Sequence, residues 1–421
     1  MNQKDKSRRD FLNHSAKAAA ASTFVLVNRN VMGANDAIRI GSIGCGGRGG
    51  WHIGWVHRSS EVVPAQIIAV ADVWDAKLDS ASEAVEQRFG RKPARYKDYK
   101  KMLENPDIDA VVIATPDHQH SSQLMEAVQA GKDVYVEKPI ASNLEILNNA
   151  YDVVTQSDRV VQNGSQGRSS KGALAAKRFI QEGKMGKVLR IEESRSAYNP
   201  YWNYYQQPKS PNVTDWDGFQ MHLPKKPFDA DEHGNWMGYD RFSPNTIGGW
   251  MSHLSDFVHF LTDCGMPQTS VAHGGIYSPT SENQRTNPDT VTAIVDYAEG
   301  FSTLFTTHFG NGANNYTMLF GTKGTMKLND PDGNVDGIQP RVSGEGSEHP
   351  ERLPDEYREL DEIAQDDHMI NWLKCIKSRK QPNAHMKYGY MQGVAVLLAD
   401  QARIQERKMR FDEKKRMILP M

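Results

Sequence analysis

The chain of 421 residues has few cysteines, no long apolar run and almost no net charge. Its three cysteines, Cys45, Cys264 and Cys375, are too scattered for a disulfide framework or a thiolate metal site. No apolar run is long enough to span a bilayer. The formal net charge of −2 gives no electrostatic case for nucleic-acid binding. These absences leave a globular protein, and the length favours two domains.

The N-terminal segment, residues 1–34, is similar to a twin-arginine export signal. It carries the run Ser-Arg-Arg-Asp-Phe-Leu at residues 7–12, followed by an alanine-rich, mildly apolar stretch. That pathway carries proteins that are already folded. We therefore expect a periplasmic protein that engages the twin-arginine export machinery. A disordered basic tail is the alternative.

From about residue 37 to 165, short apolar runs alternate with helix-compatible segments, which is typical of a mostly parallel sheet. We therefore expect an α/β fold with a parallel-sheet domain over residues 37–166. The expected strands are 38–43, 67–72, 109–114, 133–136 and 159–162. The expected helices are 48–58, 75–89, 118–130, 142–156 and 171–182.

The second half of the chain, residues 167–421, has mostly strand-like runs with few helices between them. This pattern predicts a C-terminal α+β domain with a largely antiparallel open sheet. The expected strands are 187–197, 269–277, 290–298, 301–309, 315–320 and 323–328, with helices at 366–378 and 387–406. Residues 198–246 are rich in Trp, Tyr, Asn and Pro, and so long an irregular segment is usually functional. Residues 330–360 are expected to form a surface loop.

A Gly-x-Gly-x-x-Gly turn follows the first expected strand and precedes a helix-compatible segment. Such glycines allow a tight turn, approach of the backbone to a pyrophosphate, and close helix–strand packing. Asp72 ends the next strand, where a carboxylate accepts hydrogen bonds from an adenosine ribose and repels a 2′-phosphate. The sequence therefore predicts an NAD site, with NADP disfavoured; a purely structural turn is the alternative. The expected turn contacts are Gly44, Gly46, Gly47, Arg48 and Gly49.

Two polar segments follow later strands, at the edge where open α/β sheets bind ligands. The first is Thr-Pro-Asp-His-Gln-His at residues 115–120, and the second is Glu-Lys-Pro at residues 137–139. Pro139 keeps Lys138 out of helical geometry. A lysine beside a nicotinamide can polarise a carbinol or carbonyl oxygen. Taken alone, Glu-Lys-Pro is equally compatible with a surface turn.

These three motifs, in this order and spacing, resemble the Gfo/Idh/MocA oxidoreductases over roughly residues 37–330. The resemblance implies that residues 37–166 form a Rossmann dinucleotide-binding domain. It implies further that Lys138 is the active-site lysine and that His120 lies near the nicotinamide. It also implies a homo-oligomer, a dimer or tetramer, because the open sheet of this family often forms the oligomer interface. The remaining expected cofactor contacts are Asp72, Thr115, Pro116, His120, Glu137, Lys138 and Gln166.

The family usually offers a second catalytic group, a His four residues after an Asp on a helix. Here His253 matches the histidine, but Gly249 stands where the Asp is expected. His253 is therefore expected to act as the acid/base alone, since imidazole titrates near neutrality. Asp256, one helical turn on, is expected to orient its ring. A packed helix histidine is the alternative. The predicted catalytic residues are thus Lys138, His253 and Asp256.

Substrate contacts are expected from two segments. Gln166 and Arg168 match a polar segment that lies near the cofactor or substrate in relatives, with ordinary capping as the alternative. Aromatic rings among residues 198–222 can meet the apolar faces of pyranose rings, although core packing is equally open. The predicted substrate contacts are Arg168, Tyr201, Trp202, His222 and His253. No histidine pair has metal-site spacing, so no metal is expected.

The leading hypothesis is an NAD(H)-dependent oxidoreductase that acts on a ring hydroxyl of a sugar, glycoside or polyol. Because the twin-arginine pathway carries folded proteins, we expect the cofactor to be acquired before export, held tightly and regenerated in place. Lys138 would polarise the reacting oxygen and His253 would move the proton. A redox-neutral NAD-dependent glycosidase, similar to glycoside hydrolase family 109, is the first alternative. A non-catalytic nucleotide- or sugar-binding module is the second, and it would need neither Lys138 nor His253.

Overall fold

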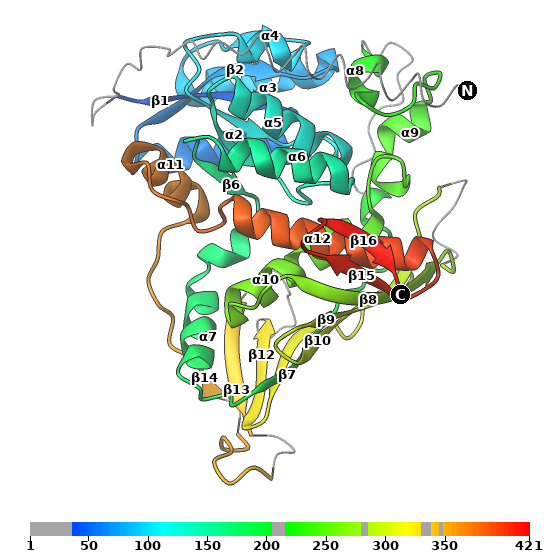
Figure 1. Ribbon diagram of the computed structural model, residues 1–421. Coiled ribbons are helices and arrows are strands. Elements are labelled where there is room, and N and C mark those ends of the chain that lie inside the picture. Colours follow the sequence, from blue (N-terminus) through cyan, green and yellow to red (C-terminus); the bar gives the residue numbers. More distant parts are fainter. Residues whose placement is uncertain (1–35, 204–214, 279–284, 330–337, 345–347, 357) are drawn as a thin grey trace. The chain divides into compact units, whose positions relative to one another are not determined.

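The computed structural model describes residues 36–203, 215–278, 285–329, 338–344, 348–356 and 358–421. The predicted export signal, residues 1–34, lies outside the described residues. The described residues form two sheets, one of six strands and one of ten (Figure 1).

The six-stranded sheet has the order β3-β2-β1-β4-β5-β6, and all its strand pairs are parallel. Its strands are β1 (Ile38–Ile43), β2 (Ala65–Ala71), β3 (Ala94–Tyr96), β4 (Ala110–Ile113), β5 (Asp133–Val136) and β6 (Val161–Asn163). Every residue of β4 and β5 is buried, as expected for strands covered on both faces. The order reverses between β1 and β4, which makes the carboxyl ends of these two strands the switch point where such sheets bind ligands.

Helices and short helical turns connect these strands. They are α2 (Gly47–Ser59), α3 (Asp75–Phe89), α4 (Tyr99–Leu103), the turn η1 (Asp117–Gln119), α5 (His120–Gln129), α6 (Leu144–Thr155) and the turn η2 (Gln166–Ser169). The predicted Rossmann-type arrangement is therefore confirmed. The sequence reading missed β3 and α4, which are only 3 and 5 residues long.

The ten-stranded sheet has the order β14-β13-β12-β11-β7-β10-β9-β8-β15-β16. Its strands are β7 (Val188–Ser194), β8 (Pro267–Gly275), β9 (Thr290–Tyr297), β10 (Phe301–Thr307), β11 (Tyr316–Gly321), β12 (Gly324–Asn329), β13 (Ile338–Ser343), β14 (Arg358–Glu359), β15 (Met409–Asp412) and β16 (Met417–Pro420). β7 and β10 pair in parallel, and all other neighbouring strands of this sheet are antiparallel. The predicted, largely antiparallel sheet is confirmed.

One face of this sheet is covered and the other is open. In β9, Val291, Ala293 and Val295 are buried in a core shared with α7 (Lys171–Gln181) and α10 (Ser252–Thr262). The alternate residue Ile294 is 37% exposed and pairs with Val271, which is 40% exposed. This alternation is typical of an antiparallel sheet packed on one side only.

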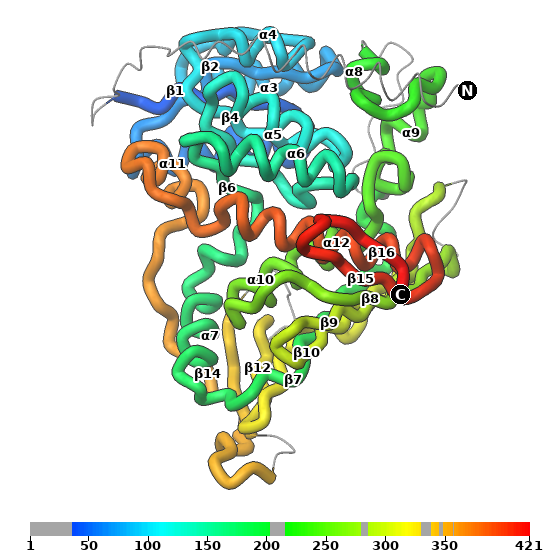
Figure 2. Tube along the Cα trace, viewed as in Figure 1, coloured from blue at the N-terminus to red at the C-terminus, as the bar shows by residue number. Residues whose placement is uncertain are grey.

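The C-terminal part of the chain returns to the first sheet. α11 (His368–Ser378) and α12 (Met386–Ile404) follow β14, and α12 lies beside α6 (Figure 2). Tyr390, Val394 and Leu398 of α12 share one apolar core with Leu147 and Ala150 of α6. The Rossmann core is therefore completed by residues far beyond residue 166.

The prediction of a surface loop at residues 330–360 is wrong for part of this range. Ile338–Ser343 forms β13, which pairs with β12, and Arg358–Glu359 adds the two-residue strand β14. Val342 is buried in the core of the second sheet. A polar, Gly/Pro-rich composition hid this strand because its apolar residues are few and irregularly spaced.

The irregular segment predicted to be functional contains several short helical pieces. They are η3 (Tyr201–Asn203), α8 (Trp216–Gln220), α9 (Ala230–Gly234) and η4 (Trp236–Gly238). A π-helical turn (Ile247–Met251) follows the segment and leads into α10. We call residues 215–243 the cap. Phe219, Tyr239 and Phe242 form its buried aromatic core.

Across the described residues, no helix combines the length and apolar character needed to cross a bilayer.

Candidate active site

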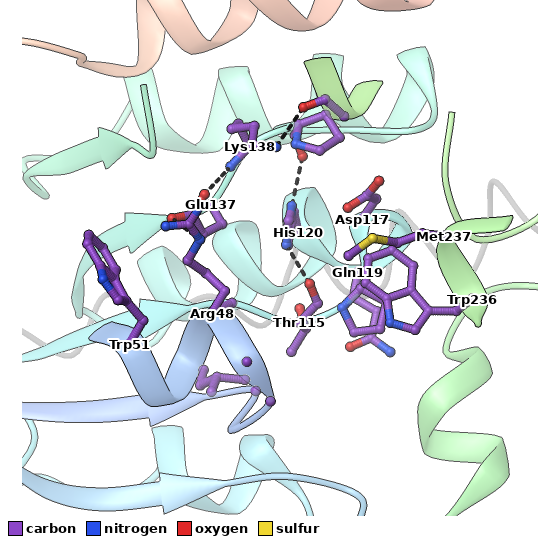
Figure 3. Close-up of a pocket in the computed structure, with 18 of the residues that line it drawn as sticks. Arg48, Trp51, Thr115, Asp117, Gln119, His120, Glu137, Lys138, Trp236 and Met237 are labelled. Carbon is purple, nitrogen blue, oxygen red and sulfur yellow. Dashed lines mark hydrogen bonds and ion pairs between the residues drawn. The ribbon is translucent and has the colours of Figure 1, made fainter. Parts of the chain in front are cut away.

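A cavity of about 630 Å³ opens at the carboxyl ends of β1, β2, β4 and β5. Its volume is in the range of sites for small molecules and cofactors, about 300–1,000 Å³. The wall also includes residues from α10, the cap, η3 and the second sheet. Figure 3 shows how Lys138, Glu137, His120, Thr115 and Arg48 gather along it. The cavity thus lies at the switch point of the parallel sheet.

The glycine turn has the geometry that a pyrophosphate requires. Gly44 has φ +82°, and a Cβ on Gly49 would collide with the carbonyl oxygen of Gly44. By contrast, a Cβ on Gly46 would meet nothing within 4 Å. Gly46 caps α2 without a side-chain hydrogen bond, so the amide groups of the first helical turn remain available to an anion. The residues present therefore fit a dinucleotide.

Asp72 is held where a ribose would be recognised. Its carboxylate accepts hydrogen bonds from the backbone N–H of Cys45, at 2.7 Å, and of Trp74, at 2.9 Å. Burial raises the pKa of Asp72 above its ordinary value. Each carboxylate oxygen keeps a further lone pair. Asp72 lines the cavity, where it can accept hydrogen bonds from ribose hydroxyls.

A buried carboxylate, Glu137, organises the Glu-Lys-Pro segment. Its Oε1 is 2.8 Å from Nε2 of His52 and accepts a hydrogen bond from Nε2 of Gln166 at 3.0 Å. Its Oε2 accepts the backbone N–H of Lys138 at 3.1 Å, and Nε of Arg48 is 3.6 Å from Oε1. Burial lowers the pKa of His52 to about 4, which makes its imidazole a neutral partner. Glu137 thereby fixes the backbone that carries Lys138.

The side chain of Lys138 extends to the π-helical turn that precedes α10. Its Nζ donates a hydrogen bond to the carbonyl oxygen of Gly249 at 2.8 Å, and its bond to Pro139 is cis. Burial lowers the pKa of Lys138, partly offset by Glu137 and Asp117. One of its three donors is engaged by Gly249, which leaves donors available to a substrate oxygen.

His120 links the two strand-end segments. Its Nδ1 lies 2.7 Å from the carbonyl oxygen of Pro139 and its Nε2 lies 2.8 Å from that of Thr115 (Figure 3). The ring lines the cavity, as predicted, but both nitrogens are engaged by the protein. His120 therefore connects the segment at residues 115–120 with the Glu-Lys-Pro segment at residues 137–139.

His253 lies in the first turn of α10 and lines the same cavity as Lys138. Burial lowers the pKa of His253 well below its ordinary value, and the cations Lys138, Arg195 and Arg48 lower it further. The imidazole is therefore neutral at physiological pH and can accept a proton. This placement agrees with the predicted acid/base position.

The structure corrects the predictions for Asp256 and Arg168. Nε of Arg168 is 2.7 Å from Oδ1 of Asp256, and both side chains are almost completely buried. The guanidinium also lies 3.8 Å from the ring centroid of Tyr388. Asp256 is thus paired with Arg168 instead of orienting His253. Arg168 is buried in a structural ion pair instead of contacting a substrate.

Of the substrate contacts predicted from residues 198–222, only Tyr201 lies in the cavity wall. Tyr201 lines the cavity and donates a hydrogen bond to the carbonyl oxygen of Asn245 at 3.1 Å. Trp202 is 1% exposed and packs edge-on against Phe309, so its core-packing alternative is the correct one. The ring of His222 lies in the cap, 6.1 Å from that of His118, instead of in the cavity wall. Gly49 also lies outside the cavity wall, where it allows close packing against the Gly44 carbonyl.

Sequence reasoning missed several wall residues. Arg195, which follows β7, lies with its guanidinium 5.2 Å from the ring of Trp250, beside His253. Trp250 follows Gly249 in the stretch that matched the family, which was the available signal. Trp236 and Met237 of the cap also line the cavity. Their only signal was the aromatic-rich irregular segment.

Comparison with known proteins identifies similarities in the N-terminal part of the described chain. Residues 38–165 match the family model described as "Oxidoreductase family, NAD-binding Rossmann fold" (GFO_IDH_MocA). The chain is 32% identical over 189 residues to glycosyl hydrolase family 109 protein 2 of Shewanella sp. (strain ANA-3), covering 42% of this chain and 40% of that protein. It is 30% identical over 168 residues to inositol 2-dehydrogenase/D-chiro-inositol 3-dehydrogenase of Lacticaseibacillus casei, covering 40% and 47%. These matches span less than half the length of either relative.

The whole fold also resembles solved structures. The WlbA dehydrogenase of Bordetella pertussis, solved with NADH and UDP-GlcNAcA, aligns with a TM-score of 0.66 at 16% identity, covering 92% of this chain and 99% of that one. At this identity the likeness concerns the fold alone. The residues that match the family model include the four strands whose carboxyl ends line the cavity. Residues 38–165 therefore match the NAD-binding Rossmann domain described by the Gfo/Idh/MocA oxidoreductase family model.

Proposed function

We propose that the protein is an NAD(H)-dependent oxidoreductase acting on a ring hydroxyl of a sugar, glycoside or polyol. The observation that carries the proposal is one cavity with three features. It contains the open turn at Gly46, the ammonium group of Lys138 and the neutral imidazole of His253. The sugar and polyol enzymes among the similar proteins support the substrate class.

When bound, NAD would supply hydride transfer at its nicotinamide ring. Lys138 donates a hydrogen bond to the substrate oxygen and stabilises the negative charge that develops on it. His253 accepts the hydroxyl proton during oxidation and returns it during reduction. Tyr201 and Trp250 provide aromatic faces for the apolar side of a sugar ring.

The test is a spectroscopic survey of the purified protein loaded with NAD⁺. Monosaccharides, methyl glycosides and inositols are added singly, and NADH absorbance is followed. We expect at least one sugar or polyol to produce NADH, and the Lys138→Ala variant to produce none while it keeps its NAD⁺. If no compound reduces bound NAD⁺ and no aryl glycoside is cleaved, the proposal is refuted.

A redox-neutral glycosidase is the second candidate, and the 32% identity to a glycosyl hydrolase family 109 protein favours it. In that reaction transient oxidation acidifies a neighbouring C–H, so that elimination and water addition release the aglycone. Aryl glycosides distinguish the two candidates. Release of the phenol without net NADH formation favours the glycosidase, whereas lasting NADH formation favours the dehydrogenase.

We also propose that residues 1–34 direct export through the twin-arginine pathway to the periplasm. The Arg8–Arg9 pair supports this. Replacement of both arginines by lysine should leave the protein in the cytoplasmic fraction. Periplasmic location of that double variant would exclude the proposal.

A homo-oligomer, dimer or tetramer, is proposed through the open face of the ten-stranded sheet. Val271 and Ile294 are neighbours in register there and are 40% and 37% exposed. Light scattering should give a dimer or tetramer for the wild type and a smaller species for Ile294→Asp. A wild-type monomer would exclude the proposal.

A further inference from the structure

The cap forms one wall of the cofactor cavity near the end of β2. On the Rossmann side, the residues that follow Asp72 line the cavity, namely Val73, Trp74 and Lys77. On the opposite side, the cap contributes Gly218, Phe219, His233, Trp236 and Met237. In dinucleotide-binding sheets the acidic residue that ends the second strand marks the adenosine half of the site. The cap therefore faces the adenosine half.

Direct contacts tie the cap to this end of the cavity. The ring of His233 lies edge-on to the ring of Trp74, with centroids 5.3 Å apart. Val73 and Trp236 both pack against the buried aromatic core of the cap. Gln119, Trp236 and Met237 all line the cavity (Figure 3). The cap thus adjoins both the β2 end and the loop after β4.

Buried hydrogen bonds anchor the cap to that loop. The carbonyl oxygen of Phe219 is 2.8 Å from Nε2 of His118 and accepts a hydrogen bond from Nε2 of Gln119 at 2.7 Å. Oγ of Ser243 donates to Oδ2 of Asp117 at 2.7 Å. These partners are all less than 10% exposed. Opening the cap would break these bonds together and leave buried polar groups unpaired.

The cap is also held together internally. Nη1 of Arg241 is 2.8 Å from Oε2 of Glu232, and both side chains are only about 15% exposed. The rings of Phe219 and Phe242 pack edge-on, with centroids 5.4 Å apart. Because its core is packed and its anchors are buried, the cap is a fixed wall, in contrast to surface flaps that open on each turnover.

We propose that this fixed cap retains the adenosine half of NAD, so that the cofactor stays bound through many turnovers. The inference rests on the NAD-binding part of the proposed function. Trp236 offers the largest aromatic surface of the cap in the cavity wall, and aromatic faces stack well on nucleobases. A cofactor held in this way must be re-oxidised or re-reduced in place by a second substrate or by the later steps of a redox-neutral cycle.

The test measures NADH dissociation, which requires no substrate. Full-length protein is freed of nucleotide, loaded with NADH and mixed with excess NAD⁺, and the decay of NADH fluorescence gives the dissociation rate. We expect a wild-type rate at least about 100-fold below a typical turnover of ~10 s⁻¹. Trp236→Ala should release NADH at least about tenfold faster.

Tyr277→Ala is the matched control, because Tyr277 is an exposed aromatic residue outside both the cap and the cavity wall. Its NADH dissociation rate should remain close to that of the wild type. Ser243→Ala removes one anchor without touching the cavity wall and should also accelerate release, which keeps the test valid if Trp236→Ala fails to fold. Wild-type release as fast as turnover, or equal rates in wild type, Trp236→Ala and Ser243→Ala, would overturn the inference. NADH binding that is fast and reversible would leave the proposed function intact, whereas no binding at all would overturn both.

Discussion

The hydroxyl group of Tyr201 lies where a side chain on residue 249 would have to be. A Cβ built on Gly249 would collide with this hydroxyl and with the ring carbon that carries it. The position where the resembling family usually has an acid is therefore filled by a phenol from η3. The same glycine presents its carbonyl oxygen to Nζ of Lys138. His253 thus lies in a cavity where Tyr201 occupies the place of the acid that the resembling family usually has.

Gly249→Asp should destabilise the protein instead of restoring an acid/base pair. The new side chain would force Tyr201 out of its contact with Asn245, and overpacking of this kind costs about 1–3 kcal/mol. Urea unfolding measures the change. The double variant Gly249→Asp/Tyr201→Ala should recover part of the loss. Full stability of Gly249→Asp alone would show that the Tyr201 ring is not fixed there.

Lys138→Ala should abolish turnover and leave bound NAD in place. Loss of the group that polarises the reacting oxygen is expected to lower kcat by about 10²–10⁴-fold. Lys132 is the matched control, because its ammonium donates to the carbonyl oxygens of Asn105 and Ile108 away from the cavity. Lys132→Ala should lower stability while the folded protein keeps its kcat. Equal activity of Lys138→Ala and wild type would remove Lys138 from the mechanism.

Asp256→Ala should be severely destabilising, because it leaves the buried guanidinium of Arg168 without its partner. Breaking such a pair typically costs about 3–5 kcal/mol. Thermal unfolding should show a large fall in Tm for Asp256→Ala and a smaller fall for the double variant Arg168→Met/Asp256→Leu. A stable Asp256→Ala protein with an altered pH–rate profile would instead support the original idea that Asp256 orients His253.

His259 should make the protein less stable in mild acid. Burial lowers its folded pKa to about 3, below the ordinary value of 6.5, so the unfolded chain binds the extra proton first as pH falls. The stability is complete above pH 6.5 and is lost progressively below it. Between pH 7 and pH 5 the wild type should lose about 2 kcal/mol more than His259→Phe, measured by urea unfolding. Parallel pH profiles would show that the folded imidazole titrates normally.

Local sequence patterns predicted the parts of this fold that depend on neighbouring residues. The turn from Gly44 to Gly49 and the strand that leads to Asp72 are short-range features, since their glycine spacing and apolar runs directly reflect backbone geometry. The expected strand 38–43 and helix 75–89 agree with β1 and α3 to the residue. The resemblance to a family then predicted Lys138 and His253 as active-site residues, and both line the same cavity.

Long-range pairing could not be predicted in this way. The ion pair of Asp256 with Arg168 joins residues 88 positions apart, and helical spacing alone pointed Asp256 toward His253. The cap contacts the Asp117–Gln119 turn about 100 residues before it. β13 depends on its pairing with β12 more than on its own composition. Such contacts are set by tertiary packing, which overrides local preference.

The central claim is that a pyrophosphate binds at the open glycine turn. Calorimetric titration of nucleotide-free protein with NAD⁺ tests this claim most directly. The wild type is compared with two alanine variants. A Cβ on Gly46 has free space, so Gly46→Ala should keep the wild-type Tm, whereas a Cβ on Gly49 would collide with the Gly44 carbonyl and should lower it. We expect one NAD⁺ to bind per wild-type chain, NADP⁺ to bind more weakly, and Gly46→Ala to fold normally and bind NAD⁺ at least about tenfold more weakly. No heat of NAD⁺ binding to the wild type, or equal NAD⁺ affinity in wild type and Gly46→Ala, would contradict the account.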